Sequence, residues 1–280
     1  MKKMISRRSF LAAAGVSAAA LALTACGGSA STASSAASSV AASSEAASTS
    51  AAAAELTTVE AGKLTMATNA AFPPYEMTTD AGEFEGIDIE TAQAIADKLG
   101  LELQIDDMDF DAALLSVQQG KADIVMAGVT VTDERKAVMD FSDSYATGIQ
   151  SIIVPEGSDI ASPDDLAGKK IGTQRGTTGY IYCSDDFGDE NVVAYDDGLT
   201  AVQALNNGQV DAVVIDNAPA KEFVAANPGL VILDTSYAEE DYAIGVAKGS
   251  SLKDAVNAAL EELKADGTLQ SIVDKYITAE

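Results

Sequence analysis

One stretch of the sequence combines residue types that suit the binding of a carboxylate. After an apolar segment at 124–126, the chain passes Gly128 and the hydroxyl-bearing Thr130, and reaches Arg135 directly behind two acidic residues. Acidic residues favour the first turn of a helix, so Arg135 is expected at a helix start. Free backbone N–H groups and a planar guanidinium can together hold both oxygens of a carboxylate. The alternative is a surface arginine that pairs with its acidic neighbours.

A second charged residue, Asp216, ends another apolar segment and precedes a helix expected to begin near Asn217. In open α/β sheets, ligands bind beyond the carboxyl ends of the strands. If two lobes face each other, Arg135 and Asp216 would look into one cleft from opposite sides. This pair suits a zwitterion, with the carboxylate on the arginine and the ammonium on the aspartate. Asp216 could also serve as the N-cap of its helix, and both roles are compatible.

A third stretch, at 174–179, is a loop of glycine and threonine that follows an expected strand and opens a helix. Such a loop can hold an anion or a carboxylate on its backbone N–H groups. It lacks the lysine and the spacing of a phosphate-binding loop, so the sequence predicts no nucleotide site.

Composition excludes several functions. The 280 residues include no histidine, which excludes Ser-His-Asp and Cys-His catalysis and ordinary zinc sites with histidine ligands. The formal charge is −26, from 43 acidic and 17 basic residues, which argues against nucleic-acid binding because phosphates require clustered Lys and Arg. The acidic pairs at 106–107, 185–186 and 196–197 lack the spacing of a calcium loop and are interpreted as solvated turns. We expect no metal and no cofactor.

The elements that must position these residues alternate between strands and helices, which predicts an α/β fold with a largely parallel sheet covered on both faces. The length suggests about two domains. The proline-containing segment 72–76 is predicted to be a loop. Strands are expected at 64–68, 101–105, 124–126, 149–154, 170–173, up to 216, 231–233 and 242–246, and helices at 89–99, 110–119, from 163, from 217, 252–265 and 269–276.

The chain also contains an internal repeat. Residues 112–125 resemble residues 200–213, since each reads as a helix, a glycine stop, an aspartate and a buried strand. We therefore expect the same helix–strand unit in two separate lobes, one leading to Arg135 and the other to Asp216.

The N-terminal residues read as an export signal. Residues 1–26 comprise basic residues, an apolar run too short to span a membrane, and Cys26 at the end of a sequence that resembles a bacterial lipobox. Arg7 and Arg8 also resemble a twin-arginine signal. The alternative is an ordinary signal peptide with a chance cysteine. Residues 27–55 are rich in Ala and Ser and are interpreted as a flexible tether. Lipidation of Cys26 would anchor the protein to the outer face of a bacterial membrane.

Taken in order, the motifs of the folded part resemble those of family 3 extracellular solute-binding proteins, the amino-acid-binding proteins of ABC importers. The motifs are Asn69 with 72–76 (FPPYE), 86–90 (GIDIE), 127–132 (AGVTVT) with 134–136 (ERK), 140–142 (DFS), Gln174 with 176–178 (GTT), and Asp216. The resemblance covers about residues 60–280. It implies a two-lobed periplasmic-binding-protein type II fold, with lobe 1 at 56–145 and 243–280, lobe 2 with the hinge segments at 146–242, and a ligand cleft between them.

The resemblance also implies roles for individual residues. The expected ligand-binding residues are Asn69, Phe72, Tyr75, Phe110, Gly128, Thr130, Arg135, Gln174, Thr177, Thr178 and Asp216. Arg135, Thr130 and the Gly128 backbone would take an α-carboxylate, and Asp216 an α-ammonium. Aromatic residues would wall the side-chain pocket, with a plain core role left open for Phe110.

The expected partners are a free amino acid, polar or cationic, and the transmembrane subunits of an ABC permease. Many members of this family carry a carboxylate where this chain has Asn69, which leaves specificity open, although Glu76 and Gln174 could read a polar or cationic side chain. Two alternatives remain at this point: an enzyme on the same fold, similar to cyclohexadienyl dehydratases, and a ligand-sensing binding protein.

Overall fold

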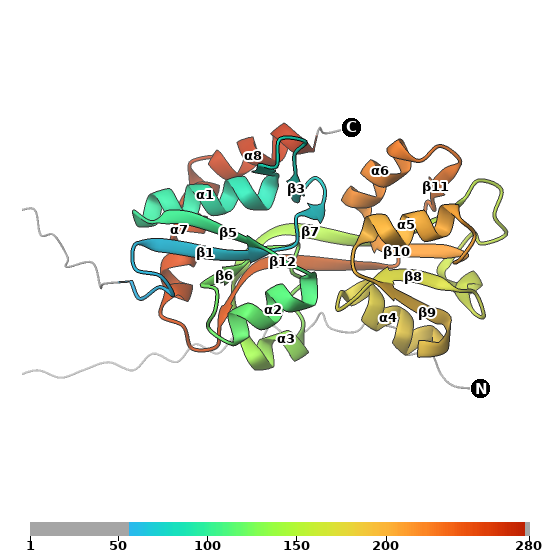
Figure 1. Ribbon diagram of the computed structural model, residues 1–280, viewed down its shortest axis with the longest axis horizontal. Coiled ribbons are helices and arrows are strands. Elements are labelled where there is room, and N and C mark those ends of the chain that lie inside the picture. Colours follow the sequence, from blue (N-terminus) through green and yellow to red (C-terminus); the bar gives the residue numbers. More distant parts are fainter. Residues whose placement is uncertain (1–55, 278–280) are drawn as a thin grey trace, which may run out of the picture. The chain divides into compact units, whose positions relative to one another are not determined.

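The structure is a computed structural model that describes residues 56–277, which lie within one compact unit (Figure 1). The expected signal peptide, the lipobox Cys26 and the Ala/Ser tether lie outside the described residues. Within residues 56–277, no helix combines the length and the apolar content needed to cross a bilayer.

One sheet of nine strands connects two lobes. Its order is β5-β1-β6-β12-β7-β10-β8-β9, with β11 paired to β7. The strands are β1 (Lys63–Thr68), β5 (Glu102–Asp107), β6 (Ile124–Val125), β7 (Met139–Pro155), β8 (Ile171–Gln174), β9 (Val192–Tyr195), β10 (Ala212–Asp216), β11 (Leu230–Ile232) and β12 (Ala238–Ala247). Figure 1 shows β7 and β12 running side by side between the lobes, and the two strands pair antiparallel.

The sheet is parallel only within each lobe. In the first lobe β1 pairs in parallel with β5 and β6, and in the second lobe β8 pairs in parallel with β9 and β10. The expectation of a largely parallel sheet is therefore wrong for the centre, where β7 and β12 cross between the lobes. The expected strand at 149–154 is the last part of β7, which has 17 residues.

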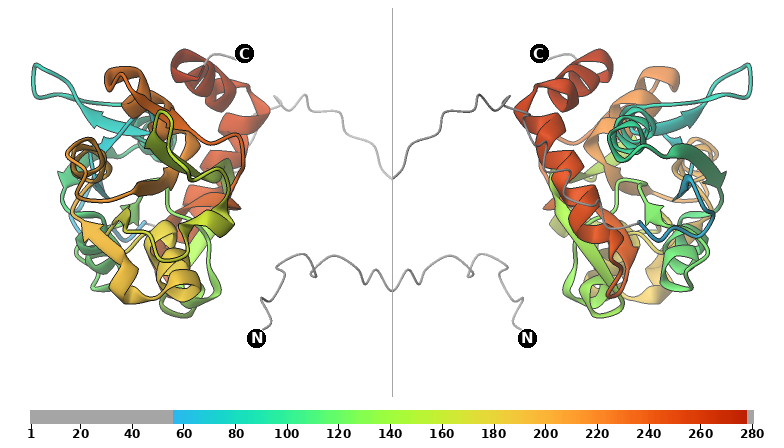
Figure 2. Two further views of the ribbon diagram at one scale, coloured as in Figure 1. Left: turned by 90° about the vertical axis from the view of Figure 1, so that its right-hand side faces the viewer. Right: turned by 90° about the vertical axis from the view of Figure 1, so that its left-hand side faces the viewer.

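Helices cover both lobes at the predicted places. They are α1 (Ile87–Leu99), α2 (Phe110–Gln118), α3 (Asp133–Val138), α4 (Thr178–Phe187), α5 (Gly198–Asn206), α6 (Asn217–Ala226), α7 (Leu252–Ala265) and α8 (Thr268–Tyr276), with 3-10 turns η1 (Pro163–Leu166) and η2 (Asp189–Asn191). Figure 2 shows the two C-terminal helices together on one side of the molecule, where α1 packs against both of them. The last helices thus return to the first lobe.

One small sheet was not predicted from the sequence. Strands β2 (Ala71–Phe72), β3 (Glu76–Thr78) and β4 (Phe84–Glu85) form an antiparallel sheet where the prolines predicted a loop. The prolines themselves, at positions 73 and 74, lie in the turn between β2 and β3. The prediction therefore holds for the turn and is wrong for the strands on either side of it, which are too short to show an alternating pattern.

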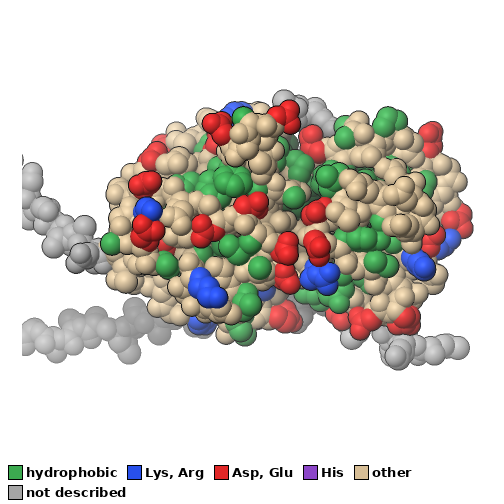
Figure 3. All heavy atoms as spheres, in the orientation of Figure 1, with side chains coloured by type: hydrophobic (Ala, Val, Ile, Leu, Met, Phe, Trp, Pro, Cys, Tyr) green, Lys and Arg blue, Asp and Glu red, His purple; other side chains and the backbone are tan. Residues whose placement is uncertain are grey.

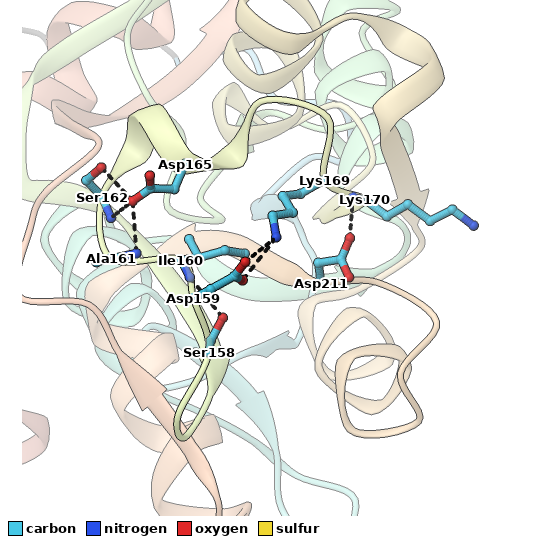
Figure 4. Close-up of polar contacts among 9 residues, drawn as sticks. All are labelled: Ser158, Asp159, Ile160, Ala161, Ser162, Asp165, Lys169, Lys170 and Asp211. Atoms are coloured by element: carbon cyan, nitrogen blue, oxygen red, sulfur yellow. Dashed lines mark hydrogen bonds and ion pairs between the residues drawn. The ribbon is translucent and has the colours of Figure 1, made fainter.

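The repeated unit is present in both lobes. Helix α2 leads to β6 and helix α5 leads to β10. In the first copy, the Asp123 carboxylate accepts the backbone N–H groups of Val59 and Thr65, both at 2.8 Å. In the second copy, Asp211 accepts the N–H of Lys170 at 2.8 Å (Figure 4). In both copies, the aspartate before the strand therefore hydrogen-bonds the backbone of the adjacent strand or of the residue just before it.

The connection before β8 is held by further polar contacts of the same kind. The Asp165 carboxylate accepts the backbone N–H groups of Ala161 at 3.1 Å and Ser162 at 3.0 Å, and Lys169 pairs with Asp159 at 3.0 Å (Figure 4). Ser162 occupies the predicted N-cap position and Pro163 begins the turn as expected. These contacts hold the connection between β7 and β8 in place.

Three clusters of buried apolar residues form the core. The largest includes residues of both lobes, the second lies under α2, and the third lies in the second lobe. Cys183 is fully buried in the third cluster, and burial raises the pKa of its thiol to about 12. Its position indicates a packing role for this thiol.

Candidate functional site

All of the expected ligand-binding residues except Tyr75 line one cavity between the lobes. The lining consists of Asn69, Phe72, Glu76, Phe110, Ala127, Gly128, Thr130, Arg135, Gln174, Thr177, Thr178 and Asp216. Residues from the ends of β1, β6, β8 and β10 contribute to it, so the cavity lies beyond the carboxyl ends of the parallel strands.

Arg135 is a buried residue of this cavity, with 8% of its surface exposed. Its backbone N–H donates to the side chain of Thr132, the N-cap of α3, at 3.1 Å. Its guanidinium donates to the carbonyl of Thr130 at 2.7 Å and, across the cleft, to the carbonyl of Gly176 at 3.1 Å. It also lies over the ring of Phe110, 5.4 Å from the ring centroid. The alternative of a solvated surface arginine is therefore wrong.

Asp88 accepts a hydrogen bond from the loop that follows β6. Gly128 adopts a φ of 54°, and an added Cβ would lie 2.9 Å from the ring of Phe72, so this position needs glycine. Its N–H donates to Asp88 at 3.0 Å, and the Tyr145 hydroxyl donates to the same oxygen at 2.8 Å. Because that N–H is already hydrogen-bonded, only the Gly128 carbonyl remains for a ligand. The absence of a side chain lets a ligand come close to the backbone there.

Asp216 ends β10 and is buried at 8% exposure. Its carboxylate accepts a hydrogen bond from Gln150 Nε2 at 2.8 Å and another from the Tyr242 hydroxyl. Asp216 occupies the N-cap position of α6, but within the described chain its side chain makes no capping hydrogen bond. Burial raises the pKa of Asp216 to about 7, although the Tyr242 hydrogen bond opposes the shift. A cation beside it would favour the ionised form.

The second lobe closes the cavity with the loop before α4. Thr177 is the N-cap of α4 and accepts the N–H of Tyr180 at 3.3 Å. Gln174 Nε2 donates across the cleft to Asn69 Oδ1 at 2.8 Å. Gly176 adopts a φ of 76°, and a Cβ there would lie 3.1 Å from the side chain of Asp111 in the first lobe. The two lobes are thus in direct contact around the cavity.

The aromatic residues divide into two groups. Phe72 and Phe110 line the cavity, and Phe110 also belongs to the core under α2, so its position is compatible with both expected roles. Tyr75 instead stacks behind Phe72, with 5.9 Å between ring centroids, and lies edge-on to Tyr242 at 5.3 Å. It lines a separate groove beside the crossover strands. Tyr75 therefore does not line the cavity in which the family resemblance placed it.

Glu76 also lines the cavity, although it was not among the expected ligand-binding residues. It is fully buried, and its carboxyl group lies beside that of Asp88, with no hydrogen-bond donor among the described residues reaching its two oxygens. Burial first, and then the charge of Asp88, raises the pKa of Glu76 well above its usual value. Ala127 also lines the cavity and was not predicted. Glu76 is the first residue of β3, and this strand of three residues is too short for its sequence pattern to predict which side chains are buried.

Glu240 and Gln150 lie behind the cavity on the two crossover strands and were missed. Glu240 belongs to β12, where acidic neighbours at 239 and 241 make the segment look solvated. In the structure it is 7% exposed and accepts the Gln150 side chain at 3.0 Å. Period-two alternation along β12 would have placed it on the buried face together with Tyr242.

The surroundings of the site are acidic. Acidic side chains are spread over both lobes on the face shown in Figure 3, and several border the junction between the lobes. Such a field favours the approach of cations. Among residues 56–277, no group of three or more His, Cys, Asp or Glu side chains is arranged to hold a metal ion.

Comparison with known proteins agrees with this architecture. Residues 64–279 match the sequence profile of the bacterial extracellular solute-binding proteins, family 3. The chain is 33% identical to the L-cystine-binding protein TcyJ of Escherichia coli (strain K12), over 79% of this chain and 85% of the relative. It is also 33% identical to the arginine-binding extracellular protein ArtP of Bacillus subtilis (strain 168), over 78% of this chain and 87% of the relative.

Solved structures show the same similarity. An ancestral arginine-binding protein bound to glutamine is 42% identical, with a TM-score of 0.75, and the match covers 79% of this chain and 100% of that chain. The arginine-, lysine-, histidine-binding protein ArtJ from Geobacillus stearothermophilus is 34% identical with a TM-score of 0.75, over 78% and 96% of the two chains.

The fold and the interlobe cavity define a two-lobed solute-binding protein. The chain belongs to the bacterial extracellular solute-binding proteins of family 3. It is an extracytoplasmic substrate-binding protein of an amino-acid ABC importer.

Proposed function

We propose that the protein binds a cationic L-amino acid such as arginine between its lobes. The observation that carries this proposal is the presence of two buried carboxyl groups, Glu76 and Asp216, in the cavity that contains Arg135. When both carboxyl groups are ionised, they and the guanidinium sum to one negative charge, and because the pKa of Glu76 is raised, a cation beside it is needed to favour its ionised form. A ligand with one carboxylate, one α-ammonium and one side-chain cation complements them, because buried charges require partners.

Each end of such a ligand has a partner in the cavity. Arg135 takes the α-carboxylate and Asp216 takes the α-ammonium. The side-chain cation lies toward Glu76, whose carboxylate oxygens meet no hydrogen-bond donor among the described residues and can accept its N–H groups. Phe72 and Phe110 flank the aliphatic part and offer ring faces to a cation. The loop at 176–178 closes on the ligand from the second lobe.

A neutral polar amino acid such as glutamine is the second candidate. The amides of Asn69 and Gln174 meet inside the cavity and could pair with a ligand amide instead of with each other. A structural relative is described as bound to glutamine. In that case Glu76 would remain protonated, which its raised pKa permits.

Transport follows from closure of the lobes around the ligand. The hydrogen bonds that now cross the cleft must open to admit a ligand, and β7 and β12 provide the hinge. We assign lobe 1 to residues 56–145 and 243–280, and lobe 2 with the hinge to 146–242. The closed protein delivers its ligand to the permease, and lipidated Cys26 with the tether at 27–55 holds it at the membrane.

A thermal-shift screen of residues 55–280 tests the ligand class, after unfolding and refolding to remove carried-over ligand. Arginine, lysine and histidine should raise the melting temperature once their concentrations exceed the dissociation constant, and glutamine and cystine should raise it less. A shift with glutamine alone would replace the cationic assignment by the neutral one. No shift with any of the twenty amino acids or cystine would contradict amino-acid binding.

Glu76→Gln then tests the side-chain cation, with Glu85→Gln on the exposed surface as the matched control. Removing one partner of a buried charge pair costs about 2 kcal/mol or more, which is roughly 30-fold in affinity. The variant should therefore bind arginine at least that much more weakly and retain its affinity for glutamine. Equal arginine affinity in the variant and the control would remove Glu76 from the site.

The proposed role includes no catalysis. An enzyme in this cavity would need a poised general acid or base, and without histidine that task would fall to a carboxyl group such as Asp216, whose pKa is raised to about 7. Incubation with prephenate or arogenate should yield no product above background. Product formation would revive the dehydratase alternative.

A further inference from the structure

A carboxylate outside the cavity controls two of the cavity's hydroxyl groups. Glu240, on β12, does not line the cavity, but it lies behind it. Its Oε2 accepts hydrogen bonds from the Thr178 hydroxyl at 2.8 Å, Gln150 Nε2 at 3.0 Å and the Thr130 hydroxyl at 3.1 Å. Its Oε1 is buried with no hydrogen-bond partner among the described residues. One carboxylate thus joins the first lobe, the second lobe and both crossover strands.

This arrangement determines what the two threonines can offer a ligand. A hydroxyl group carries one proton and two lone pairs. The hydroxyls of Thr130 and Thr178 both lie against Glu240 and are 3.5 Å from each other, so their protons are used within this group and only lone pairs remain for the cavity. The two hydroxyls therefore act as acceptors toward a ligand. Acceptors suit an ammonium group and repel a carboxylate, so the Thr130 hydroxyl does not suit the carboxylate role that the family resemblance implies for this residue.

The negative charge of Glu240 also favours an ammonium group over a carboxylate. Besides burial, which is the larger cause, Glu240 raises the pKa of Asp216, so its negative charge reaches the proposed ammonium partner. The charge of Glu240 also raises the pKa of the Arg135 guanidinium, which burial, the larger cause, lowers. Glu240 therefore adds negative potential at one end of the ligand and weakens the positive potential at the other.

We propose that Glu240 is a positioning residue that sets specificity for the α-ammonium group, by holding the Thr130 and Thr178 hydroxyls as acceptors beside Asp216. The inference rests on the proposed residue roles in the cavity. A purely structural role is the competing explanation, because the same bonds tie the hinge strands to both lobes. The two explanations differ in whether the effect of Glu240 depends on the ligand's amino group.

Glu240→Gln separates them, with the exposed neighbour Glu239→Gln as the matched control. Binding is measured by calorimetry for L-arginine and for 5-guanidinopentanoic acid, which lacks only the α-amino group, and likewise for L-glutamine and 4-carbamoylbutanoic acid. In Glu240→Gln, the amino acid should bind at least about tenfold more weakly, as expected for a lost charged hydrogen-bond partner. The analogue without an amino group should keep its affinity or gain, because a negative charge near Arg135 is removed.

Equal weakening of the amino acid and its analogue would show a structural role and overturn the proposal, as would unchanged affinity for both. Thr178→Val provides a second variant should Glu240→Gln fail to fold, since it removes one of the held acceptors while keeping the side-chain shape. It should also weaken the amino acid more than the analogue, and an equal effect on both would overturn the proposal. If wild-type protein binds glutamine and not arginine, the cationic assignment fails while the Glu240 comparison proceeds with the glutamine pair.

Discussion

The side chains of Asn69 and Gln174 bond directly across the cleft, with 2.8 Å between Asn69 Oδ1 and Gln174 Nε2. Asn69 in turn donates its Nδ2 to the carbonyl of Met108 at 2.9 Å. The second bond orients the first, because an amide that gives its NH₂ group to Met108 must turn its oxygen toward Gln174. Two neutral amides thus link the end of β1 to the end of β8.

Asn69→Asp should destabilise the protein. A carboxylate has no proton to donate, so it would place an oxygen against the Met108 carbonyl, and the lost hydrogen bond should lower the free energy of unfolding by about 1–3 kcal/mol. The loss should be smaller at pH 4 than at pH 7, because a protonated carboxyl can donate again. Urea denaturation at both pH values measures this, with exposed Asn207→Asp as the control. A pH-independent loss would contradict the role of the Met108 bond.

Arg135→Ala should remove amino-acid binding while the fold survives. The ligand's carboxylate would be buried without its full counter-charge, which costs about 2–5 kcal/mol or roughly 30-fold to several thousand-fold in affinity. The matched control is Arg175→Ala, because Arg175 is an exposed arginine paired with Asp196. Calorimetry should show wild-type affinity in the control. Affinity within a few-fold of wild type in Arg135→Ala would contradict the carboxylate assignment.

Ligand affinity should rise with pH through the titration of Asp216. The folded-state pKa of Asp216 is raised to about 7, and an ammonium ligand prefers the ionised form. Binding should therefore tighten between pH 5.5 and pH 8, by up to roughly 30-fold, and release a proton at pH 6. Calorimetry in buffers of different ionisation enthalpy measures both quantities. Asp216→Asn should bind weakly at both pH values, and a flat profile for the wild type would contradict the prediction.

The same pKa shift affects the stability of the unliganded protein. Asp216 ionises less readily when folded than when unfolded, so its contribution to stability is present at low pH and is lost as the pH rises from about 4 to 7. Asp216→Asn should remove this part of the pH dependence of unfolding. The control is Asp133→Asn, because the Asp133 side chain is 97% exposed. This variant should leave the pH dependence of unfolding unchanged.

Gly148→Ala should disturb the hinge. An added Cβ would lie 2.5 Å from the ring of Tyr242, a fully buried side chain that cannot move aside without losing its bond to Asp216. Overpacking of this kind costs about 1–3 kcal/mol in unfolding free energy. Tyr242→Phe isolates the hydroxyl, since it keeps the ring. Wild-type stability in Gly148→Ala would show that β7 and β12 can separate there without cost.

The sequence was most informative where local pattern and local structure agree. Helix α1 illustrates this, because it ends at Leu99 as predicted, most of its apolar residues are buried, and Gly100 follows it in the left-handed conformation. The repeat likewise predicted α2 with β6 and α5 with β10. The long strand β7 was recognised only in part, since residues 139–148 are mostly polar or small and are paired by β12 from the other end of the chain.

The order and types of residues by themselves determined the family, the alternating elements, and the presence of an arginine and an aspartate at the ends of two separate strands. Only the tertiary structure decided that Tyr75 does not line the cavity, that Glu76 is buried beside Asp88, and that Glu240 accepts hydrogen bonds from the hydroxyls of Thr130 and Thr178. The physical reason is that periodicity reports which face of an element is buried. Which carboxyl meets which hydroxyl depends on how β7 and β12 bring distant segments together.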